Sequence, residues 1–201
     1  MARKESGFMN MVTTLFLVTL VAAGLMGSVY ALTKEPIRLA ELKRKNEAIG
    51  VVVPGFDNEP SREVQKIYMD GDTLYLYTAR KGDQVLGTAV ETFTKIGFSG
   101  EFRLMVGFRP DGSIIDIAVI VHAETPGLGS KMERDKSDFH VQFMGKNPER
   151  FKLAVKKDRG DVDAITASTI TSRAYCDAVQ RAYDALVKIN GTSSDQDVTD
   201  F

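Results

Sequence analysis

The chain has 201 residues, and its 26 basic and 27 acidic residues leave a formal net charge of −1. This balance gives no electrostatic basis for binding nucleic acid. The length accommodates one compact domain together with an N-terminal anchor. The single cysteine, Cys176, excludes an internal disulfide and is expected to be a small packed residue rather than a nucleophile.

A long uncharged segment lies near the N-terminus. Residues 8–32 contain no Asp, Glu, Lys or Arg, and about 20 apolar residues suffice to span a membrane as a helix. The apolar core exceeds the roughly 7–15 residues of a typical signal-peptide core. A signal peptide cleaved between Gly24 and Ser28 is the alternative. We expect residues 1–35 to form a cytoplasmic N-terminus and a retained transmembrane helix.

The segment after the span is predicted to be a connector. Pro36 suits the first turn of a helix that continues from Ile37 to Ile49 with a charged outer face. We therefore expect a solvated connector helix and loop over residues 36–62. Contact of its basic residues with membrane lipid is a second interpretation.

From Val64 onward the sequence pattern changes to that of strands. The turn sequences Asp70-Gly71-Asp72 and Pro110-Asp111-Gly112 separate runs rich in β-forming residues. These runs are 64–69, 73–79, 84–93, 102–108 and 114–122. They predict an antiparallel sheet.

Helices are expected to cover part of this sheet. Apolar residues recur at helical spacing from Ser172 to Ile189, and Asp138 to Met144 is a second candidate. The sequence thus predicts one α+β domain over residues 63–190. The polar, acidic residues 191–201 are expected to form a disordered tail.

A cluster of hydroxyl groups lies where the long helix is expected to begin. The segment from Asp163 to Arg173 contains Thr166, Ser168, Thr169, Thr171 and Ser172. A helix start offers unpaired N–H groups and the positive end of the dipole, which suit a phosphate. Arg173 is placed to add a charge-assisted contact. Local chemistry alone also allows simple capping of the helix.

A second polar segment follows the last expected strand. Glu124-Thr125-Pro126-Gly127-Leu128-Gly129 forms a tight loop, and its glycines allow a backbone to approach a flat ligand closely. An ordinary Pro-Gly turn is the alternative. The chain lacks His-x-x-x-His, Cys-x-x-Cys, Gly-x-Ser-x-Gly, Gly-x-Gly-x-x-Gly and P-loop motifs. A metal site, a serine nucleophile and binding of NAD or ATP are therefore not expected.

Together, the two segments resemble the motifs of the FMN-binding domain family found in two related redox complexes. The loop from Glu124 to Gly129 matches all six residues of the Glu-Thr-Pro-Gly-Leu-Gly motif. The hydroxyl-rich segment resembles the flavin-attachment motif, beginning at Asp163. Two of its positions depart from that motif, because Ala167 replaces the usual Gly and Ser168 the usual Ala.

The resemblance implies a covalently bound FMN, attached by a flavin transferase through a phosphoester. The chain has no signature of a substrate pocket, so no catalytic residue and no metal ligand are expected in it. The residues that it places at the flavin are Thr171, as the attachment point, and Thr169, Ser168, Ser172, Glu124, Thr125, Leu128 and Gly129 as contacts.

Within this family, the chain resembles the G subunits of Rnf complexes, which are ion-translocating ferredoxin:NAD oxidoreductases. The alternative is the C subunit of the sodium-pumping NADH:quinone oxidoreductase, usually a longer chain. Either resemblance implies an electron-transfer protein that works with other membrane subunits and keeps its domain on the periplasmic side. The number of basic residues on each side of the span alone would instead place the C-terminal domain in the cytoplasm. A cofactor-free, membrane-anchored assembly module remains a further alternative, but it leaves the pair of motifs without an explanation.

Overall fold

The computed structural model describes residues 7–196, which divide into two compact units with their boundary between Lys43 and Arg44. Residues 1–6 of the expected cytoplasmic N-terminus and residues 197–201 of the expected tail lie outside the described part. The helix α1 (Phe8–Val52) runs across this boundary.

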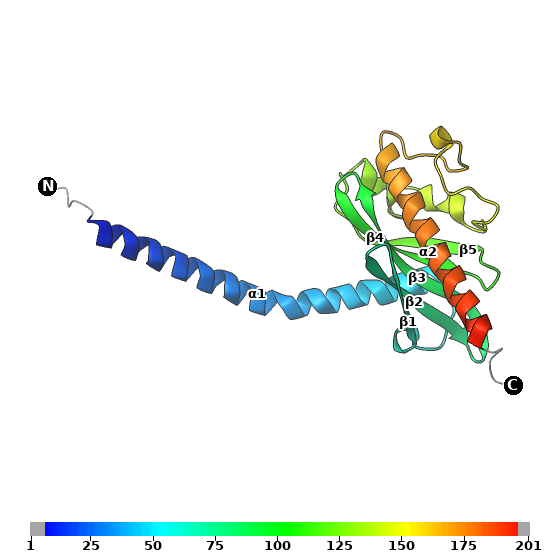
Figure 1. Ribbon diagram of the computed structural model, residues 1–201, viewed down its shortest axis with the longest axis horizontal. Helices are drawn as coiled ribbons and strands as arrows, with labels where there is room; N and C mark the ends of the chain where they lie inside the picture. Colours follow the sequence, from blue (N-terminus) through cyan, green and yellow to red (C-terminus); the bar gives the residue numbers. More distant parts are fainter. Residues whose placement is uncertain (1–6, 197–201) are drawn as a thin grey trace. The chain divides into compact units, whose positions relative to one another are not determined.

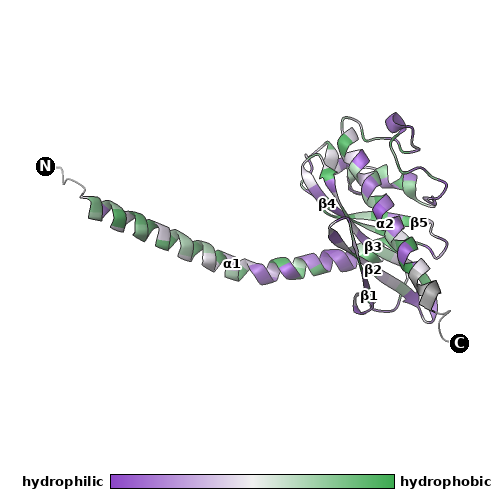
Figure 2. Ribbon diagram, in the orientation of Figure 1, coloured by the Kyte–Doolittle hydropathy of each residue, from purple (hydrophilic) through white to green (hydrophobic). Residues whose placement is uncertain are grey.

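The first unit carries one segment that is long and apolar enough to cross a membrane. Its best 18-residue window has a mean hydropathy of 2.1 and is 0% buried. Figure 2 shows the change along α1 from hydrophobic to hydrophilic residues. The expected connector helix is not separate, because Pro36 lies inside α1. Proline has a helical φ, so it removes one hydrogen bond without dictating a helix end at this position.

The second unit is built on a five-stranded antiparallel sheet, as the sequence predicts. The strands are β1 (Val64–Met69), β2 (Asp72–Lys81), β3 (Gln84–Gly97), β4 (Gly100–Phe108) and β5 (Ile114–Val121). Their order in the sheet follows the order in the chain. The long β3 and β4 meet in a tight turn at Phe98 and Ser99. Phe98 in this turn lines the candidate functional site.

The helix α2 (Thr169–Gln196) packs on one face of the sheet (Figure 1). Its buried Ala174, Ala178, Val179, Ala182 and Leu186 join the main core with inward-facing residues of the strands. Contrary to the expectation of a tail from Gly191, α2 continues to Gln196. A glycine inside a helix costs about 1 kcal/mol relative to alanine, which does not by itself end a helix.

The last turns of α1, which belong to the second unit, cover the opposite face. Ile49 and Val52 are buried there against strand residues such as Met105. A side chain at Gly107 would begin 2.2 Å from the carbonyl oxygen of Val52, so only glycine allows this approach. Lys45 reaches the buried carboxylate of Glu91 at 3.0 Å. The sheet is therefore covered on both faces.

Between β5 and α2 the chain is mostly irregular and includes the short 3-10 helices η2 (Gly129–Met132), η3 (Phe139–Phe143) and η4 (Lys156–Asp158). A fourth, η1 (Pro60–Arg62), precedes β1. The helix expected from Asp138 to Met144 is η3. Its Phe139 and Phe143 pack on Tyr175 of α2. Cys176, on the next position of α2, is buried, and burial raises the pKa of its thiol to about 12.

Candidate functional site

The two polar segments singled out in the sequence meet in the structure. The hydroxyl of Thr171, in the first turn of α2, donates a 2.8 Å hydrogen bond to Oε2 of Glu124 in the loop after β5. The other carboxylate oxygen accepts the backbone N–H of Ser99 at 3.1 Å. Glu124 is 4% exposed and Thr171 is 1% exposed. One buried carboxylate thus connects the β3–β4 turn, the loop after β5 and the start of α2.

A cavity of about 300 Å³ lies at this junction. It is lined by Phe98, Thr125, Leu128, Gly129, Ala167, Ser168, Thr169, Ile170 and Thr171. Six of the eight residues that the sequence assigns to a flavin are among them. The other two, Glu124 and Ser172, lie behind the wall. Phe98, Ala167 and Ile170 were not expected at the site.

The rim of the cavity is unusually apolar for an exposed surface. Phe98 is 66% exposed, Leu128 is 43% exposed and Ile170 is 47% exposed. They come from three separate elements and surround one cavity. Exposed apolar side chains gathered around a concave site are typical of a binding site for a flat, partly apolar ligand.

Gly129 allows the loop after β5 to approach the start of α2 closely. A Cβ atom at this position would lie 2.4 Å from Oε2 of Glu124 and 2.9 Å from the hydroxyl oxygen of Thr171. Contacts this short exclude a side chain unless these groups move. The glycine is therefore required by the packing of the two motif segments against each other.

The side chain of Ser172 holds the loop before α2 against the first turn of the helix. The Ser172 hydroxyl accepts a hydrogen bond from the backbone N–H of Ile165 and donates one to the carbonyl of Ser168, each at 2.9 Å. The intervening Ala167 has a φ of 62°, the left-handed conformation that glycine adopts most readily. This conformation gives a physical reason for the glycine that the related motif has at this position.

The hydroxyl groups of the segment differ in accessibility. Thr171 is buried and its hydroxyl is engaged with Glu124. Thr169 is only half-buried and lines the cavity, and its hydroxyl makes no hydrogen bond within the described residues. Thr166 is exposed and borders a different cavity, beside Asp163 and Gln142. The sequence places the attachment at Thr171, whereas accessibility favours Thr169.

Comparison with known proteins identifies the family. The FMN-binding domain family matches residues 97–184, which include both motif segments. A relative from Haemophilus influenzae (strain PittEE), named as the G subunit of an ion-translocating oxidoreductase complex, is 34% identical over 181 residues, covering 87% of this chain and 84% of the relative. Proteins of the same name from Erwinia tasmaniensis and Vibrio cholerae serotype O1 (strain M66-2) are 36% and 33% identical, each over more than four fifths of both chains. This chain belongs to the family of these G subunits.

A solved structure is also similar, that of NqrC from Shewanella oneidensis. It has 20% sequence identity and a TM-score of 0.42, and the match covers 60% of this chain and 61% of that one. Membership of the G-subunit family agrees with the first of the two resemblances seen in the sequence. Together with the apolar segment of α1, it makes the chain a single-pass membrane protein.

Arg173 does not supply the phosphate contact expected of it. Its guanidinium binds the carboxylate of Asp158 through two hydrogen bonds, of 2.6 and 2.8 Å. This interaction holds the pKa of the Asp158 carboxyl below its usual value of 3.8. The spacing along the sequence could not show it, because Asp158 lies 15 residues away on an irregular segment.

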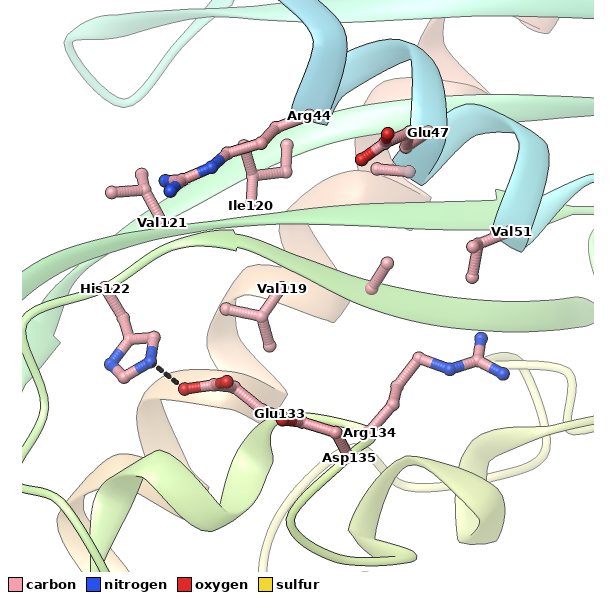
Figure 3. Close-up of a pocket in the computed structure, with 12 residues that line it drawn as sticks. Arg44, Glu47, Val51, Val119, Ile120, Val121, His122, Glu133, Arg134 and Asp135 are labelled. Atoms are coloured by element: carbon pink, nitrogen blue, oxygen red, sulfur yellow. Dashed lines mark hydrogen bonds and ion pairs between the residues drawn. The ribbon is translucent and has the colours of Figure 1, made fainter. Parts of the chain in front are cut away.

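His122 contacts the backbone of Glu124, the first residue of the loop after β5. Its Nδ1 accepts the backbone N–H of Glu124 at 3.0 Å, and its Nε2 contacts Glu133. This pair lies in a separate cavity of about 500 Å³, which Arg44 and Glu47 of α1 also line. Figure 3 shows the contact between His122 and Glu133. Burial raises the pKa of Glu133, but hydrogen bonds from Lys136 and His122 outweigh it and lower that pKa overall. His122 therefore positions Glu124 without lining the flavin-type cavity.

Proposed function

We propose that this chain is a membrane-anchored electron-transfer protein that carries FMN covalently on Thr169. The observation that carries the proposal is the position of the Thr169 hydroxyl. Thr169 is half-buried and lines the cavity where both motif segments meet, and its hydroxyl makes no hydrogen bond within the described residues. Bound FMN supplies the electron-accepting and electron-donating ring, while the protein positions the ring and tunes its potential.

The residues of the cavity fit such a group. Three exposed apolar side chains, Phe98, Leu128 and Ile170, provide a surface that an isoalloxazine ring can cover. Backbone N–H groups of the first turn of α2 have no intrahelical partner. Together with the helix dipole, they favour a phosphate at Thr169 by about 1 kcal/mol. An attachment point at the first residue of α2 places the phosphate where these groups are available.

Thr171 is less suited to carry the flavin. A transferase would have to break its hydrogen bond with Glu124 and open a side chain that is 1% exposed. At Thr169 the hydroxyl oxygen can form its bond to phosphorus without that rearrangement. In this step the Thr169 oxygen bonds to the phosphorus of the FMN unit of a flavin dinucleotide donor. The P–O bond of the diphosphate bridge breaks, the nucleoside monophosphate leaves with the bridging oxygen, and the hydroxyl proton is lost to solvent. The flavin transferase is thus a transient partner of the exposed start of α2.

The test uses two matched substitutions that each remove one hydroxyl and keep the β-branched shape. The full chain is produced with its transferase and run on a denaturing gel. Thr169→Val should lose in-gel flavin fluorescence, and Thr171→Val should retain it. Peptide mass spectrometry of the unmutated chain should place an FMN-sized addition on Thr169. If fluorescence is lost in Thr171→Val and kept in Thr169→Val, the flavin is attached to Thr171 and not to Thr169. An unmutated chain without fluorescence would contradict the proposal as a whole.

The second part of the proposal concerns the side of the membrane and the partners. The relatives are named as parts of an ion-translocating oxidoreductase complex. We assign the domain to the periplasmic side, where it exchanges electrons with other membrane proteins of such a complex. A domain of this size translocates largely regardless of flanking charge. Protease added to intact spheroplasts should digest the domain, whereas digestion only after lysis would place it in the cytoplasm.

A further inference from the structure

Glu124 is a buried carboxylate without a cationic partner. It is 4% exposed, and both of its oxygens accept hydrogen bonds, from the N–H of Ser99 and the hydroxyl of Thr171. Acceptance at both oxygens is the pattern of an ionised carboxylate. Within the described residues, no Lys, Arg or His side chain forms an ion pair with it. Hydrogen bonds, rather than an ion pair, therefore stabilise its charge.

This charge lies directly behind the wall of the cavity. A Cβ atom at Gly129 would be 2.4 Å from Oε2 of Glu124, and one at Gly97 would be 2.8 Å from Oε1. Gly129 and Thr171 both line the cavity, so one layer of atoms separates the carboxylate from it. The absence of a side chain at Gly129 permits this short separation, and the absence of one at Gly97 leaves room for Oε1 beside β3.

Among the described residues, Glu124 is the charged side chain next to this cavity wall. None of the nine residues that line the cavity is charged. The nearest basic residue on α2, Arg173, is neutralised by its pair with Asp158. A charge in a poorly hydrated environment acts over a longer distance than a charge in water, because the local dielectric constant is low.

We propose that Glu124 is a positioning residue that also sets the reduction potential of the flavin. Its carboxylate holds the β3–β4 turn, the loop after β5 and the start of α2 together around the cavity. Its fixed negative charge disfavours the uptake of electrons by a ring in that cavity and so lowers the potential. This inference rests on the proposed function, since it assigns a role to Glu124 toward FMN bound there.

Two substitutions separate the charge from the hydrogen bonds. In Glu124→Gln, the amide oxygen can accept from Ser99 and the amide nitrogen can donate to the hydroxyl oxygen of Thr171, so the contacts persist without the charge. Thr171→Val removes one hydrogen bond and leaves the charge in place. Both are made in the full, detergent-solubilised chain with covalent FMN, together with Glu124→Asp, which keeps the charge.

The measurement is a spectroelectrochemical titration of the bound FMN. Glu124→Gln should shift the midpoint potential to more positive values, and the shift should exceed that of Thr171→Val or Glu124→Asp. A potential unchanged in Glu124→Gln, while the unmutated chain shows flavin fluorescence, overturns this inference and leaves the proposed function intact. Loss of the flavin from Glu124→Gln also contradicts it, because the inference assigns Glu124 to the potential rather than to attachment.

A flavin-independent measurement tests the positioning role. Hydrogen–deuterium exchange of the chain before flavin attachment should be faster around Ser99 in Glu124→Ala than in Glu124→Gln, because only glutamine can replace the lost acceptor. Equal exchange in both variants and in the unmutated chain would show that Glu124 does not hold this turn.

Discussion

The hydroxyl of Thr171 and Oε2 of Glu124 lie 2.8 Å apart and join two segments separated by 47 residues. Neither side chain is accessible to solvent to any useful extent. The contact therefore belongs to the framework of the site rather than to its exposed surface. It also explains why a loop at the end of the sheet and the start of a helix form one cavity.

The first prediction concerns the stability that this hydrogen bond provides. Thr171→Val leaves Oε2 of Glu124 buried without its donor, and an unsatisfied buried acceptor costs about 1–3 kcal/mol. We expect a lower midpoint of thermal or chemical unfolding in the detergent-solubilised chain. Thr171→Ser, which keeps the hydroxyl, should lose less. Equal stability of the valine and serine variants would show that this hydrogen bond contributes little.

The second prediction concerns Gly129. An alanine there must displace Glu124 or Thr171, because its Cβ would lie 2.4 and 2.9 Å from their oxygen atoms. Overpacking of this kind costs typically about 1–3 kcal/mol. Gly50→Ala is the matched control, since it adds the same methyl group to a helical position with nothing within 4 Å. Unfolding midpoints should fall for Gly129→Ala and stay unchanged or rise for Gly50→Ala.

The third prediction concerns the backbone at Ala167. Its φ of 62° is unfavourable for a residue with a Cβ and comfortable for glycine. We expect Ala167→Gly to be neutral or to stabilise the chain by up to about 1 kcal/mol. The same exchange within α2, Ala178→Gly, should destabilise, because that alanine is helical and buried. A clear loss of stability in Ala167→Gly would argue against the left-handed conformation.

The sequence predicts the fold well because the strands and α2 have regular patterns. All five expected strands are present, but β3 continues to Gly97, four residues beyond its expected end, and β4 begins at Gly100, two residues before its expected start. The candidate membrane span lies where charged residues are absent. The connector helix expected to begin at Pro36 does not form separately, because Pro36 lies inside the continuous helix α1. Helix α2 begins at Thr169, three residues before the expected start, because the loop before it is closed by the Ser172 side chain.

The site is predicted only in part, because proximity in space is not visible in local sequence. The two motifs supply the residues from the loop after β5 and from α2, but nothing local indicates that Thr171 is turned toward Glu124. Phe98 was missed because it lies between two expected strands, outside both motif segments. Its signal was a large apolar residue at the tip of a hairpin, where exposure is otherwise unfavourable.

The fourth prediction concerns pH and the pair of Asp158 and Arg173. The side-chain hydrogen bond from Arg173 lowers the pKa of Asp158 below 3.8, its value in the unfolded chain. The pair therefore stabilises the folded state fully above that value, and this stability is lost as the pH falls through the lower, folded pKa. Asp158→Asn should be less stable than the unmutated chain at neutral pH, and the difference should shrink in acid. A difference that does not depend on pH would exclude this ion pair as its source.

The last prediction concerns Phe98, the aromatic residue at the tip of the β3–β4 turn. Because the side chain is 66% exposed, its removal should change the free energy of unfolding by no more than about 0.5 kcal/mol. It nevertheless lines the cavity, so Phe98→Ala should alter the absorption spectrum of native, flavin-loaded protein if the ring lies against it. Tyr68→Ala is the control, since Tyr68 is 70% exposed on β1, at the other edge of the sheet from β5. Identical native spectra in both variants would mean that the flavin ring does not contact this turn, and would restrict the site to the loop after β5 and the start of α2.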